Sequence, residues 1–169
     1  MKKVEKTIGY SLRKVKVENM EFRELMEVNA ASKEIREKKR ILLIGSCLID
    51  EHPKIVEKYS EGKAKLKVCL EREHFNMVCL KLSSIISRVP IEEIIVLTVD
   101  GSPHCIQLHF MMNEIEKITG KNLNIRHILI YKGEDIEVDA ETVKKARYLT
   151  KIYGMKNATT SLSNQGGED

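Results

Sequence analysis

The sequence predicts an α/β fold of three layers, in which a mostly parallel β-sheet has helices on both faces. Short apolar runs rich in β-branched residues alternate along the chain with longer segments of helical periodicity. These runs are apolar almost throughout, which is typical of parallel strands buried on both faces. The length of 169 residues fits one domain. We therefore expect a single α/β domain over residues 1–155.

Residues 1–40 are expected to form a helical extension of this domain. Between Glu18 and Arg40 the chain contains no Gly or Pro, and apolar residues recur from Phe22 to Ile35 with approximate helical spacing. The charges are acidic first and basic at the end, as the helix dipole favours. This pattern predicts an amphipathic N-terminal helix that can contact a protein partner or a second copy of the chain.

Four segments are predicted strands. The first, residues 41–45, is a continuous apolar run that ends in Gly45, and a weaker candidate covers residues 66–70. Residues 94–99 form the clearest strand, because they are almost wholly apolar and largely β-branched. A further strand is expected over residues 125–131.

Helices are predicted between and after these strands. Residues 73–89 place Cys79 on an apolar helix face, so this cysteine is expected in the core, and Pro90 closes the helix. Ser102 reads as an N-cap, followed by a helix that stops at Gly120. The last helix runs from an Asp139 cap to Gly154, and the polar residues 156–169 are expected to be a disordered tail.

Alternating strands and helices imply right-handed crossovers and a flavodoxin-like or Rossmann-like parallel sheet. In such sheets, ligands bind outside the carboxyl ends of the strands. Any functional site is therefore expected in the turns that follow residues 45, 70 and 99.

Composition limits the classes of function. The chain is 42% hydrophobic and 32% charged, with no apolar run long enough to cross a bilayer and no signal-peptide pattern, so we expect a cytoplasmic protein without membrane insertion. The net charge of +4 comes from mixed charges without interleaved aromatic residues, so nucleic-acid binding is not expected. Abundant Lys, Glu and Ile without Trp is a composition typical of thermophiles.

Three cysteines fall in the turns where a site is expected. Cys47 follows the first strand, Cys69 lies near the end of the second, and Cys105 opens the helix after the clearest strand. His109 follows Cys105 at i, i+4 spacing and so shares its helix face. Thiolate and imidazole groups bind zinc or an iron–sulfur cluster, which makes Cys47, Cys69, Cys105 and His109 candidate metal ligands.

The segment DGSPHC allows three interpretations. Cys105 lies in the first helical turn, where free amides favour a thiolate, so it is a candidate catalytic nucleophile with His104 beside it. The same amides, following Ser102, are a candidate anion site. Metal ligation is the third interpretation, and Asp100 can bind a cofactor or orient a histidine, unless it only forms the turn with Gly101.

Several well-known motifs are missing. The run Gly45-Ser46-Cys47 lacks the later glycines of a dinucleotide fingerprint, and no glycine-rich run precedes a Lys-Ser or Lys-Thr pair. No GxSxG nucleophile elbow is present. A dinucleotide-dependent oxidoreductase and a serine hydrolase are therefore disfavoured.

The GSC run after the first strand, a second cysteine further on and DGSPHC after the clearest strand resemble the small-subunit family of nickel–iron hydrogenases and the related 20 kDa quinone oxidoreductase subunits. That family holds an iron–sulfur cluster through cysteines in strand-end turns of a flavodoxin-like domain. The resemblance implies that Cys47, Cys69 and Cys105 are cluster ligands. The family's adjacent cysteine pair and its glycine-cysteine-proline turn are absent from this chain.

These observations leave three functions open. The first is a metal- or cluster-binding domain that serves redox chemistry as an accessory protein. The second is a thiol-dependent enzyme that uses Cys105, with His104 or His109 as base. The third is a non-catalytic interaction module whose N-terminal helix carries a partner. The sequence leaves open whether the protein is an enzyme.

Overall fold

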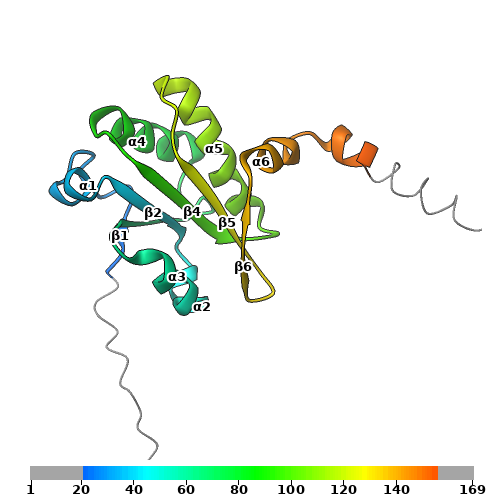
Figure 1. The fold of residues 1–169 in the computed structure, drawn as a ribbon, viewed down its shortest axis with the longest axis horizontal. Helices are drawn as coiled ribbons and strands as arrows, with labels where there is room; N and C mark the ends of the chain where they lie inside the picture. The colour runs from blue at the N-terminus through cyan, green and yellow to red at the C-terminus, as the bar shows by residue number, and fades with distance from the viewer. Residues whose placement is uncertain (1–20, 156–169) are drawn as a thin grey trace, which may run out of the picture.

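The computed structural model describes residues 21–155, which form a six-stranded sheet in the order β1-β3-β2-β4-β5-β6 (Figure 1). Neighbouring strands are parallel except β5 and β6, which are antiparallel. The strands are β1 (Arg23–Glu24), β2 (Arg40–Gly45), β3 (Ala64–Val68), β4 (Glu93–Val99), β5 (Ile125–Tyr131) and β6 (Glu134–Val138). The mostly parallel sheet predicted from the sequence is confirmed.

Helices cover both faces of this sheet, which confirms the three-layer prediction (Figure 1). The long helices α4 and α5 lie on one face, and the shorter α2 and α3 lie on the other. The helices are α1 (Lys33–Lys38), α2 (Leu48–Glu51), α3 (Pro53–Ser60), α4 (Phe75–Arg88), α5 (Pro103–Thr119) and α6 (Ala140–Ala146), and residues 149–155 are also helical.

The apolar runs of β2 and β4 supply both halves of the core. Because successive strand residues point to opposite faces, Leu43 and Val96 pack toward α4 and α5, whereas Leu42 and Ile95 pack toward α2 and α3. All four side chains are fully buried. Burial on both faces explains why these strands are continuously apolar in the sequence.

The predicted helix ends around the central strand are confirmed. Ser102 caps α5 by accepting a hydrogen bond from the Cys105 amide, and Gly120 ends the helix with a left-handed φ of 64°. The second predicted strand lies two residues earlier than expected, as β3 (Ala64–Val68). Cys69 therefore belongs to the following turn, where its carbonyl accepts hydrogen bonds from the Arg72 and Glu73 amides.

The predicted N-terminal helical extension is wrong over residues 21–32, and its residues 1–20 lie outside the described part of the chain. In its place β1 pairs with the edge of β3, and Leu25 donates its amide to the Lys67 carbonyl at 2.9 Å. Ser32 then caps the short α1, which Lys39 ends with a φ of 53°. The apolar residues of this segment bury against the sheet, and the Ile35 side chain of α1 is fully buried, so α1 offers no apolar face to a partner.

The C-terminal part differs from the prediction in two ways. The helix that starts at the Asp139 cap ends at Ala146, and residues 149–155 form a separate helical stretch. Before the helix that starts at Asp139, Lys132 and Gly133 both have positive φ and form a tight turn. This turn adds β6 as an antiparallel edge strand. The tail predicted over residues 156–169 lies outside the described residues. Between residues 21 and 155, no helix is long and apolar enough to cross a membrane.

Candidate functional site

A cavity of about 140 Å³ lies at the carboxyl ends of β2, β3 and β4. Strand β3 lies beside β2 on one side, and β4 lies beside β2 on the other side. This is the point where a doubly wound sheet reverses its strand order, and it is where such sheets bind ligands. The volume is similar to that of a cavity that accepts one benzene molecule, about 150 Å³.

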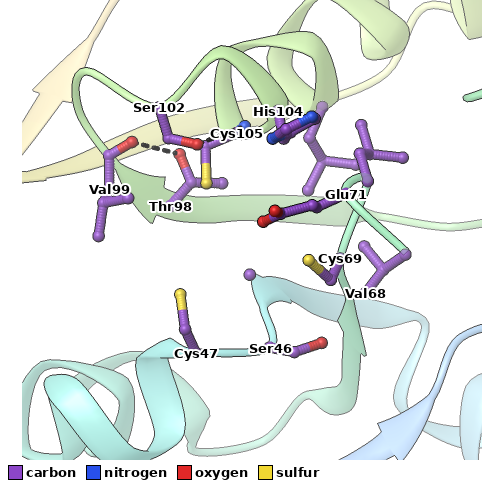
Figure 2. Close-up of a pocket in the computed structure, with 13 residues that line it drawn as sticks. Ser46, Cys47, Val68, Cys69, Glu71, Thr98, Val99, Ser102, His104 and Cys105 are labelled. Atoms are coloured by element: carbon purple, nitrogen blue, oxygen red, sulfur yellow. Dashed lines mark hydrogen bonds between the residues drawn. The ribbon is translucent and has the colours of Figure 1, made fainter. Parts of the chain in front are cut away.

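The cavity brings together the three strand-end cysteines. Cys47 caps α2 after β2, Cys69 lies in the turn after β3, and Cys105 lies in the first turn of α5 after β4. Their sulfur atoms point into the same space from three sides (Figure 2). A Cβ added at Gly45 would lie 3.8 Å from the Cys105 sulfur, which places that sulfur over the end of β2. All three are free thiols.

Backbone hydrogen bonds hold the turns that carry these thiols. The Ser46 amide donates to the Val68 carbonyl at 3.1 Å and so joins the turn after β2 to the end of β3. The Cys69 carbonyl closes its own turn, and the Ser102 hydroxyl holds the Cys105 amide at 3.3 Å. The local sequence therefore positions each thiol independently, and the strand order brings the three turns together.

The surroundings of Cys47 disfavour its thiolate form. Burial is the largest cause that raises the pKa of Cys47, followed by the negative charge of Glu51 and then by Cys105, with a smaller contribution from Cys69. These groups repel one another when they are ionised. A bound cation would remove that repulsion and favour the thiolate forms.

Two of the predicted site residues line the cavity beside the cysteines, and two do not. Ser102 and His104 are part of its wall. Asp100 is exposed in the turn with Gly101, which has a φ of 83°, and is not part of the wall. His109 is not part of the cavity wall either, and its side chain is buried, with 2% of its surface exposed.

Both ring nitrogens of His109 are engaged in the core. Its Nε2 atom lies 2.9 Å from the Thr98 hydroxyl, and its Nδ1 atom lies 2.9 Å from Nδ1 of His127. The structure therefore does not bring His109 to the three thiols. Among residues 21–155, no group of three His, Cys, Asp or Glu side chains is placed to hold a metal ion.

The sequence analysis missed three polar residues of the site, Ser46, Glu71 and Thr98. Glu71 follows Cys69 in the turn after β3 and directs its carboxylate into the cavity (Figure 2). Thr98 contributes to the wall from β4. The rule that sites follow strand ends points to Glu71 once β3 is known to end at Val68, whereas Thr98 reads as one more apolar-strand residue.

Comparison with known proteins supports the fold. A family model described as a Rossmann-like domain matches residues 34–165, which is most of the chain. No curated protein and no solved structure matches the chain. The parallel sheet, its strand order and the cavity at the point of reversal agree with the family match, and the chain belongs to the family of Rossmann-like domains.

Proposed function

We propose that this protein binds an iron–sulfur cluster, or failing that zinc, in the cavity between β2, β3 and β4, and serves redox chemistry as an accessory protein. The observation that carries the proposal is the convergence of Cys47, Cys69 and Cys105, from three separate strand-end turns, on one cavity. A cysteine that serves only as a small apolar residue packs in the core, as Cys79 does. That role does not explain why three cysteines line one cavity.

The other side chains around the cavity suit a cation. Glu71 and His104 add a carboxylate and an imidazole to the three thiols, and Glu51 adds negative charge near Cys47. Thiolates are the preferred ligands of iron–sulfur clusters, and thiolates with imidazole also bind zinc. When bound, a cluster would supply one-electron chemistry, which the side chains of this chain do not supply themselves.

The donor set favours a cluster over a single zinc ion, because three thiols and one imidazole, that of His104, line the cavity. As they stand in the described residues, no three ligand side chains are placed to share one ion. Each iron of a cluster takes its own thiolate, and a cluster is larger than a single ion, so its ligand sulfurs lie further apart than those around one ion.

The anion-binding interpretation of the α5 start is less well supported. Pro103 has no amide proton, and the Cys105 amide is already bound by the Ser102 hydroxyl. The first turn of α5 therefore keeps few free donors for a phosphate. The Glu71 carboxylate in the same wall would also repel an anion.

The experiment is iron and acid-labile sulfide analysis, with absorption and electron paramagnetic resonance spectra, on protein purified or reconstituted without oxygen. Cys47→Ser, Cys69→Ser and Cys105→Ser are each expected to lose the cluster. Cys79→Ser is the matched control, because this thiol is buried on α4 and does not line the cavity. Failure of the parent protein to hold iron or zinc, or equal loss in the control, would refute the proposal.

A thiol-dependent enzyme is the second candidate, because Cys105 and His104 line the cavity together at the start of α5. Cys105 would be the nucleophile at the start of α5. His104 would be the base, because both ring nitrogens of His109 are engaged elsewhere. Rapid alkylation of Cys105 near neutral pH, slowed in His104→Gln, is expected for this function, and a sluggish thiol would exclude it.

A further inference from the structure

An apolar groove lies on the outer surface between α4 and α5, and none of Cys47, Cys69 and Cys105 lines it. It has a volume of about 400 Å³ and is lined on the α4 side by Phe75, Cys79 and Leu80. On the α5 side it is lined by Ile118, with Glu114 beside it. Leu80 is 66% exposed and Ile118 is 65% exposed, so within the described residues nothing covers the groove.

A second uncovered apolar surface belongs to residues 148–155, which we call the C-terminal arm. Leu149, Ile152 and Tyr153 follow helical i, i+3, i+4 spacing and so share one face of the arm. Leu149 is 79% exposed and Tyr153 is 67% exposed. A helix this short is marginal in water unless its apolar face packs on another surface.

The arm begins beside the groove but runs away from it. Arg147 donates a hydrogen bond to the Glu114 carboxylate at 3.1 Å, and Glu114 also borders the groove. From this point the arm projects on the side of α5 opposite to α4 (Figure 1). To cover its own groove, the chain would have to reverse its direction immediately after Arg147.

We propose that two copies of this chain exchange their arms, so that the arm of each copy lies in the α4–α5 groove of the other. A projecting arm that cannot reach its own groove without reversal can reach that of a neighbour. One chain carries one arm and one groove, so a two-fold dimer covers both surfaces twice. Anchors at i, i+3 and i+4 of a short helix are the usual way in which an amphipathic helix occupies an apolar groove.

The test is sedimentation velocity of the full chain over a concentration series in reducing buffer. The parent protein is expected to form a dimer with a dissociation constant in the micromolar range or tighter. Leu149→Glu on the arm and Leu80→Glu in the groove are each expected to weaken the dimer at least about tenfold, since each buries an unpaired charge. Tyr131→Glu is the control, because Tyr131 is 48% exposed at the end of β5, outside the groove.

Mixing the two variants separates arm exchange from any other dimer. Leu149→Glu keeps an intact groove and Leu80→Glu keeps an intact arm, so their mixture contains one intact contact per heterodimer. The mixture is expected to dimerise more tightly than either variant alone. A monomeric parent at about 100 µM, a dimer that neither variant weakens, or a mixture without recovery would each overturn the proposal.

Discussion

The two histidines in the core make a strong prediction about stability and pH. His109 and His127 are each 2% exposed, and their Nδ1 atoms lie 2.9 Å apart. Burial, with a smaller contribution from the charge of His127, lowers the pKa of His109 to about 3. Burial also lowers the pKa of His127. In the folded protein the His109 ring is therefore neutral at ordinary pH, and burial favours the neutral form of His127 as well.

Whether a falling pH raises or lowers the stability depends on how many protons the folded and unfolded chains bind. Above pH 6.5 His109 is neutral in both states and does not affect the free energy of unfolding. As the pH falls below 6.5, the unfolded chain binds a proton that the folded chain does not, so stability decreases until the pH reaches about 3. At pH 5, about 1.5 pH units below the ordinary pKa of histidine, His109 alone is expected to cost about 2 kcal/mol.

The assay is urea denaturation at pH 7.5 and pH 5.0 of the parent protein and of His109→Gln. Glutamine keeps a hydrogen-bonding group for Thr98 but does not titrate, and the other titrating groups are common to both proteins. The parent is expected to lose about 2 kcal/mol more than the variant between the two pH values. Equal losses in the two proteins would refute a neutral, buried His109.

Four further substitutions test the fold. Ile95 is fully buried in β4, so Ile95→Ala is expected to lower the free energy of unfolding, measured in urea, by about 2–5 kcal/mol. Ile136 is 44% exposed on β6, so Ile136→Ala should lower it by less than about 1 kcal/mol. Similar losses in the two variants would contradict the assigned core. Ser102→Ala removes the cap of α5 and should lower stability by about 0.5–2 kcal/mol, and an unchanged melting temperature would argue against the cap. The pKa of the Tyr59 hydroxyl is raised first by burial and then by the Asp135 carboxylate, which lies 2.5 Å away. Asp135→Asn should therefore lower the pKa of Tyr59 in an ultraviolet titration. An unchanged pKa would contradict this contact.

Part of the candidate site was predictable because it depends on strand ends. The apolar run before Gly45 and the cap at Ser102 placed Cys47 and Cys105 in turns, and the carboxyl-end rule placed those turns at one edge. His109 was not predictable in the same way. Its i, i+4 spacing from Cys105 correctly implies a shared helix, but that helix packs on the sheet, where Thr98 and His127 engage both ring nitrogens.

The N-terminal segment shows the limit of periodicity. The spacing of its apolar residues fits a helix, yet the segment forms β1 and a turn, because the edge of β3 offers backbone groups that Leu25 and its neighbours pair with. The short α2 and α3 and the hairpin strand β6 were not predicted, since their patterns are short and half exposed.

The sequence by itself determined the elements whose signals are local: the continuous apolar strands β2 and β4, the caps of α5 and α6, and the turns that hold Cys47 and Cys105. Only the tertiary structure decided the strand order, the gathering of three thiols with Glu71 in one cavity, and the exclusion of His109 from it. The physical reason is that periodicity and capping involve residues a few positions apart, whereas pairing, burial and convergence join segments that are distant in the chain.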